Sequence, residues 1–124
     1  MRGVRRLLST WLPPLAWMLL IFVLSSQHGG GRLPAEEVAL RKLAHVAEYL
    51  VLTLLLVRAL RRSGVAAAVP VACLAALVYA ASDEWHQSFV PGRTATPRDV
   101  AIDGIGIALA ALAVTRTRLR EITA

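Results

Sequence analysis

Ionisable and polar side chains fall into three short groups whose residue types suit proton transfer and anion binding. The groups are Lys42, His45, Glu48 and Tyr49, then Asp83, Glu84, His86, Gln87 and Arg93, and finally Asp99 and Asp103. A histidine beside carboxylates exchanges protons near neutral pH, so His45 with Glu48 or Asp83 is the predicted catalytic pair. Arg93 follows a Pro-Gly turn and, with Lys42, can hold a phosphate or carboxylate. The pattern predicts either acid/base catalysis or recognition of an anionic ligand by the remaining polar residues.

Imidazole and carboxylate groups also suit a divalent metal such as zinc or manganese. The candidate ligands are His45, His86, Asp83, Glu84, Asp99 and Asp103. The chain has no H-E-x-x-H spacing, nucleophile motif, Gly-rich phosphate loop or paired cysteines, so the sequence assigns no reaction, metal or cofactor. A structural scaffold is a further alternative, because buried polar groups can pair with one another and fix the register of helices.

Four long apolar segments must position these groups. They span residues 7–27, 34–62, 65–88 and 97–115. At ~1.5 Å per residue, each is about long enough to cross a ~30 Å hydrocarbon core. Hydrophobic residues make up 56% of the chain, above the roughly 45–50% that is typical of soluble domains. The sequence therefore predicts an all-α protein, a four-helix transmembrane bundle that forms a single domain over residues 1–124.

Prolines and glycines mark the ends of these segments. Pro34 suits the first position of the second helix, and Gly64 suits its end. The pair Pro91-Gly92 predicts a tight turn after the third segment, because Pro fixes the first central position and Gly readily takes the positive φ of the second. Thr96 and Asp99 have the spacing of a capping box at the start of the fourth helix.

One face of the fourth segment combines carboxylates with small residues. Asp99, Asp103, Gly106 and Ala110 share this face at helical spacing. Small residues allow another helix to approach closely. The sequence therefore predicts that a neighbouring helix packs against this face.

The distribution of basic residues predicts the orientation in the membrane. One side collects Arg2, Arg5, Arg6, Arg58, Arg61, Arg62, Arg116, Arg118 and Arg120, and the other side collects Arg32, Arg41, Lys42, Arg93 and Arg98. Because basic residues are more frequent on the cytoplasmic side, both termini are predicted to be cytoplasmic. The three polar groups then meet at the outer face.

Other classes fit the sequence less well. The net charge of +6 does not indicate a nucleic-acid partner, because the basic residues flank apolar runs and form no basic face on one element. A cleaved signal peptide over the first segment would need a shorter apolar run and a small-residue cleavage site. A channel or transporter would need ionisable residues near the middle of the spans. The single Cys73 has no partner within the chain and is assigned no function.

Order and spacing of the polar residues resemble the VanZ-like family. The matching strings are Lys42-x-x-His45-x-x-Glu48-Tyr49, Ser82-Asp83-Glu84-x-His86-Gln87-x-Phe89-x-Pro91-Gly92-Arg93, Asp99-x-x-x-Asp103-x-x-Gly106 and Ser25-Ser26-Gln27. The similarity covers about Trp11 to Val114. Two positions depart from the family pattern: Asp103 stands where asparagine is frequent, and Ala110 stands where a second glycine is common. An asparagine at position 103 weakens a role for this residue as proton donor or nucleophile.

The resemblance implies a multi-pass protein of the bacterial cytoplasmic membrane. The namesake of the family is associated with resistance to the glycopeptide teicoplanin, which acts outside this membrane on lipid-linked wall precursors. The expected partners are therefore membrane lipids, and further a lipid-linked wall precursor or the glycopeptide itself. Resistance activity of this particular chain does not follow from the resemblance.

Overall fold

The computed structural model describes residues 1–27 and 33–123, and in these residues the chain forms four helices. They are α1 (Arg2–Ser25), α2 (Ala35–Arg62), α3 (Ala68–Gln87) and α4 (Pro97–Thr123). All four are long and apolar enough to cross a membrane, so the predicted fold class is confirmed. Arg32, which entered the prediction of orientation, lies outside the described residues.

The helix bounds differ from the predicted segments mainly at the two ends of the chain. Helix α1 begins at Arg2, five residues before the expected start at Leu7, and α4 continues to Thr123 instead of ending near Thr115. The limits predicted from hydrophobicity end where charged residues begin. Arginine, leucine and glutamate are nevertheless good helix formers, so both helices continue into these flanks.

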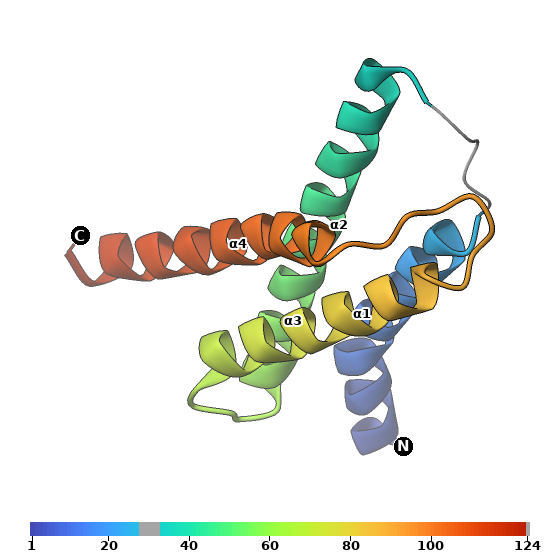
Figure 1. The fold of residues 1–124 in the computed structure, drawn as a ribbon. Helices are drawn as coiled ribbons and strands as arrows, with labels where there is room; N and C mark the ends of the chain where they lie inside the picture. Colours follow the sequence, from blue (N-terminus) through green and yellow to red (C-terminus); the bar gives the residue numbers. More distant parts are fainter. Residues whose placement is uncertain (28–32, 124) are drawn as a thin grey trace.

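Helix α2 is the central element of the bundle. It contacts each of the other three helices, whereas α1 contacts only α2 and α3 among the described elements. Figure 1 shows α4 running across α2, while α3 runs across α1. The core lies where these helices meet and consists of Ile21, Tyr49, Leu52, Leu56, Val57, Ala72, Ala76, Ala80 and Ile107.

Helices α2 and α4 touch backbone to backbone at Gly106. A Cβ atom at this position would overlap the carbonyl oxygen of Val46 and would lie 3.0 Å from the backbone nitrogen of Leu50. Ala110, one turn further along α4, is fully buried. The small-residue face predicted from the sequence is therefore packed against α2, and this contact sets the position of the first turns of α4.

Helix α1 carries two prolines, and an arginine of α2 compensates for one of them. Pro13 has no N–H to donate to the carbonyl of Ser9, one turn earlier. The Arg58 guanidinium of α2 donates to this carbonyl at 3.4 Å. At the same end of the pair, Arg6 of α1 donates to the carbonyl of Arg62 at 3.3 Å, where the last turn of α2 leaves carbonyls without a helical partner.

Two glycines with positive φ end α2 and turn the chain after α3. Gly64 has φ 81°, and the N–H of Val65 donates to the carbonyl of Leu60 at 3.0 Å, as in a Schellman motif. Gly92 has φ 77°, and the N–H of Arg93 donates to the carbonyl of Val90 at 3.2 Å. The predicted helix end and the predicted Pro-Gly turn are both confirmed.

Large apolar side chains cover the outside of α1. Leu7, Leu8, Leu12, Leu15 and Leu19 are each more than half exposed. Soluble monomers rarely expose apolar patches of this extent. A lipid bilayer is the environment in which such a surface is stable, in agreement with the length and hydropathy of the helices.

Candidate functional site

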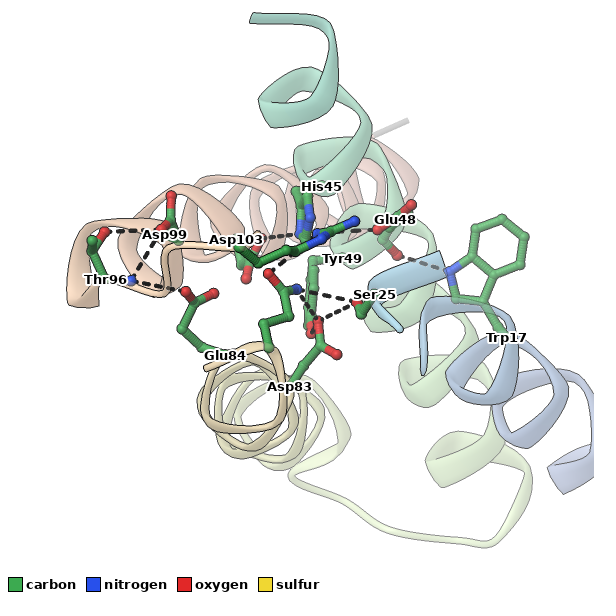
Figure 2. Close-up of polar contacts among 12 residues, drawn as sticks. Trp17, Ser25, His45, Glu48, Tyr49, Asp83, Glu84, Thr96, Asp99 and Asp103 are labelled. Atoms are coloured by element: carbon green, nitrogen blue, oxygen red, sulfur yellow. Dashed lines mark hydrogen bonds and ion pairs between the residues drawn. The ribbon is translucent and has the colours of Figure 1, made fainter. Parts of the chain in front are cut away.

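The side chain of His45 is held by a carboxylate of another helix. Its ring nitrogen Nδ1 lies 3.1 Å from Oδ1 of Asp103 and 4.0 Å from Oε2 of Glu48. Asp103 is 1% exposed, whereas His45 is half-buried. With its proton on Nδ1, the imidazole donates to Asp103, and Nε2 remains as the unprotonated ring nitrogen. Figure 2 shows this pair between α2 and α4.

The predicted proton-handling pair of His45 with Glu48 or Asp83 stays a prediction, and the hydrogen-bond partner of His45 in the structure is Asp103. Glu48 shares the helix face of His45 but remains beyond hydrogen-bond distance. Asp103 comes within reach because it lies one turn before Gly106, where α4 touches the backbone of Val46. The close contact between the helices thus brings a buried carboxylate to the histidine.

A second polar cluster is centred on Asp83 and joins three helices. Its Oδ2 atom accepts hydrogen bonds from Ser25 at 2.8 Å, from Gln87 at 3.1 Å and from Tyr49 at 3.5 Å. All four side chains are buried. Figure 2 shows Ser25, Tyr49 and Asp83 pointing toward one another. The second oxygen of Asp83, Oδ1, is buried and has no hydrogen-bond partner among the described residues. This cluster connects the end of α1 with α2 and α3.

Arg93 links the turn after α3 to the end of α1. Its guanidinium donates from Nε to the carbonyl of Gln27 at 3.1 Å, from Nη2 to the carbonyl of Leu24 at 3.3 Å, and from Nη1 to Oε1 of Gln87 at 3.4 Å. Burial lowers the pKa of the Arg93 guanidinium, and the nearby Arg41 lowers this pKa further. The guanidinium stays charged, because an arginine remains protonated at physiological pH even after such a shift.

Two further carboxylates hold the start of α4. Oε1 of Glu84 accepts a hydrogen bond from the backbone N–H of Thr96 at 2.9 Å. Oδ2 of Asp99 accepts from the same N–H at 3.2 Å and from the Thr96 hydroxyl at 2.9 Å. The side chain of Asp99 thus reaches back as the predicted capping box requires, although the hydroxyl donates to Asp99 instead of accepting a backbone N–H.

His86 lies apart from the other predicted site residues. Its ring stacks on Phe22 of α1, with ring centroids 4.5 Å apart. It lines neither of the two cavities described below. Within residues 1–27 and 33–123, no group of three or more histidine, cysteine, aspartate or glutamate side chains is arranged to hold a metal ion. The six candidate metal ligands are therefore not assembled into one centre.

A cavity of about 630 Å³ opens beside His45, between the first part of α2 and the segment that leads into α4. Its lining residues are Leu33, Val38, Arg41, Lys42, His45, Gln87, Gly92, Arg93, Thr94, Thr96, Pro97, Arg98 and Asp99. A smaller cavity of about 240 Å³ adjoins it and is lined by Leu24, Ser25, Gln27, Arg41, Ala44, His45, Glu48 and Arg93. Arg41, His45 and Arg93 line both cavities, so these three side chains stand at the junction.

Comparison with known proteins identifies the family of the chain. Residues 10–118 match the family model described as VanZ/LLP1. The chain belongs to the VanZ/LLP1 family. No curated protein and no solved structure shows a significant match. Family membership and the four apolar helices together identify a multi-pass membrane protein.

The residues predicted for the site of this VanZ/LLP1 protein divide into two sets. Lys42, His45, Gln87, Arg93 and Asp99 line the larger cavity, and Glu48 lines the smaller one. The remaining predicted residues line neither cavity and instead pair or pack within the protein. They are Tyr49, Asp83, Glu84, His86 and Asp103.

Three residues of the site were not among those predicted from the sequence. Arg41 and Arg98 line the larger cavity, and Ser25 bonds to Asp83. Arg41 entered the sequence analysis only through the distribution of basic residues, and in the structure it also forms an ion pair with Glu37 at 3.6 Å. Because Arg41 is adjacent to Lys42 in the sequence, it could have been predicted as a further cationic residue of the site. Ser25 stands at the end of the first apolar segment, at the predicted membrane level of the other polar groups. This position could have indicated Ser25 as a residue of the site.

Proposed function

We propose that this VanZ/LLP1 protein binds an anionic lipid or lipid-linked wall precursor of the cell envelope in the larger cavity. The proposal rests on the charge of the cavity wall. Among the described residues, four cationic side chains line it together with a single carboxylate, that of Asp99. The cations are Arg41, Lys42, Arg93 and Arg98. A phosphate group is the complementary ligand, because guanidinium and ammonium groups form charge-assisted hydrogen bonds with its oxygens.

Two of these cations distinguish a binding site from a scaffold. Lys42 and Arg98 are exposed and form no hydrogen bond or ion pair with the described residues. In a network that served only to fix the helices, charged groups would pair with other side chains of the protein. Oδ2 of Asp83 is paired in this way, because it accepts hydrogen bonds from Ser25 and Gln87. The Asp83 cluster therefore has a structural role, and the free cations of the cavity are available to a ligand.

Arg93 contributes a rigidly placed charge. Its three hydrogen bonds to α1 and Gln87 fix the guanidinium at the junction of the cavities. Further N–H groups of the guanidinium remain for a ligand. A side chain that is already ordered loses little conformational entropy on binding. Arg93 and Lys42 thus represent two kinds of anion contact, one preorganised and one adaptable.

The size of the cavity fits a lipid headgroup. Its volume of about 630 Å³ lies within the roughly 300–1,000 Å³ typical of small-molecule sites. The hydrocarbon part of such a ligand does not need a protein cavity, because the exposed apolar faces of the helices border the bilayer. We propose that the headgroup enters the cavity while the chains remain in the membrane.

The proposed orientation places the cavity on the outer side of the bacterial cytoplasmic membrane. It lies at the end of the bundle where α3 finishes and α4 begins, opposite the arginines near the two termini. If those arginines are cytoplasmic, as the charge distribution favours, the cavity faces the compartment that contains wall precursors and glycopeptides. This location supports the proposed connection with teicoplanin resistance.

Lipid binding can be tested with charge-neutralising variants at the two ends of the bundle. Purified protein in detergent is mixed with phosphatidylglycerol or phosphatidylcholine, and bound lipid is counted by native mass spectrometry. K42Q/R98Q should weaken phosphatidylglycerol binding roughly ten- to thirty-fold, since each basic residue near a lipid surface contributes about 1 kcal/mol. The matched control R61Q/R62Q removes two exposed arginines from the opposite end of α2 and should leave binding at the cavity unchanged. Equal binding by K42Q/R98Q and the wild type would refute the proposal.

A further inference from the structure

We infer that the site hydrolyses a lipid diphosphate, with His45 as the general base that activates water. This inference rests on the proposed function, because the diphosphate must first occupy the cavity. It adds a reaction, a substrate class and separate roles for His45 and Asp103.

The geometry of the histidine is that of an oriented base. Asp103 is buried and holds Nδ1 of His45 at 3.1 Å. The bond fixes both the ring orientation and the tautomer, so Nε2 is the nitrogen that can accept a proton. The same side chain lines both cavities. A ligand at the junction therefore lies against a histidine that a buried carboxylate has prepared for proton transfer.

The cations of the site form two pairs that match two phosphate groups. Arg41 and Arg93 line both cavities and flank His45 at the junction. Lys42 and Arg98 line only the larger cavity. A diphosphate can place one phosphate with each pair, which aligns its bridging P–O bond near the imidazole. The guanidinium groups of the first pair then stabilise the charge that develops on the phosphate oxygens.

Water is the nucleophile that we assign. Of the hydroxyl-bearing residues in the cavity walls, Ser25 donates to Asp83 and Thr96 donates to Asp99, while Thr94 forms no hydrogen bond with the described residues and has no base beside it to activate it. In the reaction the oxygen of water forms a bond to the terminal phosphorus, while the bond between that phosphorus and the bridging oxygen breaks and the lipid monophosphate departs. His45 Nε2 accepts the proton of water and passes it to the departing phosphate oxygen. The products are a lipid monophosphate and inorganic phosphate, and no oxidant or reductant takes part.

Asp103 is a positioning residue in this reaction. Among the described residues its side chain forms a hydrogen bond with His45 alone, and Asp103 itself lines neither cavity. An asparagine in its place keeps an oxygen that accepts the Nδ1–H, whereas an alanine removes it. If Asp103 acts by orienting His45, D103A lowers kcat and leaves KM nearly unchanged, and D103N restores most of kcat. A merely structural role would instead lower the amount of folded, ligand-binding protein.

The test uses farnesyl diphosphate as a defined lipid diphosphate. The full-length protein in detergent is incubated with it in water enriched in oxygen-18, and both the bound ligand and the label in released phosphate are measured by mass spectrometry. We expect the wild type to release labelled phosphate. H45Q should bind normally and release phosphate at least about 100-fold more slowly, since general-base catalysis contributes at least this factor. R61Q/R62Q serves as the control for binding and rate.

The outcomes separate this inference from the proposed function. Wild-type protein that binds farnesyl diphosphate without releasing phosphate overturns the hydrolytic activity and leaves lipid binding intact. Equal release by H45Q and the wild type removes His45 as the base. Protein that binds neither this probe nor phosphatidylglycerol refutes both proposals together.

Discussion

Replacing Gly106 with alanine should destabilise the protein, whereas the same change two residues earlier should not. A Cβ at Gly106 would overlap the Val46 carbonyl oxygen, and its other near neighbours are also backbone atoms of α2. Backbone atoms cannot rotate out of the way, so α4 has to move away from α2. Gly104 lies on the same helix, and a Cβ added there would meet no atom of another helix within 4 Å. It provides a control with the same chemical change.

The comparison isolates the cost of the steric overlap. Both variants gain the same helix propensity, about 0.8–1.0 kcal/mol per Gly-to-Ala change. This gain cancels when the two variants are compared with each other. What remains is the overpacking at Gly106, for which about 1–3 kcal/mol is typical. G106A should therefore have a free energy of unfolding about 1–3 kcal/mol below that of G104A.

Reversible unfolding in mixed micelles gives the required measurement. Sodium dodecyl sulfate is titrated against a mild detergent, and the fluorescence of the three tryptophans reports the folded fraction. Because Gly106 brings Asp103 to His45, G106A should also lower the proposed phosphate release more than G104A does. Equal unfolding midpoints for the two variants would show that the helices do not touch at this glycine, and the reasoning about the site would fail with it.

Three hydroxyl deletions test the polar contacts between helices by the same unfolding assay. S25A should lower the free energy of unfolding by about 1–3 kcal/mol, because buried Asp83 loses its shortest hydrogen bond. The control S26A, whose hydroxyl bonds to a carbonyl of α1, should lower it by less than about 0.5 kcal/mol. Equal losses in the two variants would contradict the hydrogen bond between Ser25 and Asp83. Y79F should lower the free energy of unfolding by about 0.5–1.5 kcal/mol, because the Tyr79 hydroxyl donates to a carbonyl of α1. An unchanged unfolding midpoint would exclude this hydrogen bond. T96A should lose about 1 kcal/mol through the weaker start of α4, and no loss would show that Asp99 caps the helix without the hydroxyl.

Local signals in the sequence were sufficient for the helices and the turns. Gly64 and Gly92 have the positive φ that their positions required, and Asp99 reaches back to Thr96. Each of these features depends on residues close together in the chain. Propensity and hydrophobic length therefore determine them before any helix packs on another. The ends of α1 and α4 were less predictable, because hydrophobicity detects the part of a helix within the membrane and not its charged extension.

The pairing of side chains across helices could not be predicted in the same way. The sequence put His45, Glu48, Asp83 and Asp103 at one level, and it named Glu48 or Asp83 as the partner of His45 without indicating Asp103. Asp103 reaches His45 because α4 meets α2 at Gly106, and this depends on how the two helices cross. Helical spacing alone favoured Glu48, which is the near neighbour on the same helix. The sequence thus predicted that these residues lie close together. Their hydrogen-bond partners could not be predicted, because they depend on how the helices pack.

The polar contacts of α1 constrain the order in which the protein is assembled. This helix is synthesised first, yet its Ser25 bonds to a residue 58 positions later, and its Met18 carbonyl accepts from one 61 positions later. Both partners belong to α3, so a nascent chain that ends after α2 cannot form these two contacts. Final docking of α1 must therefore await α3, so the first of these four helices in the chain is among the last to reach its native neighbours.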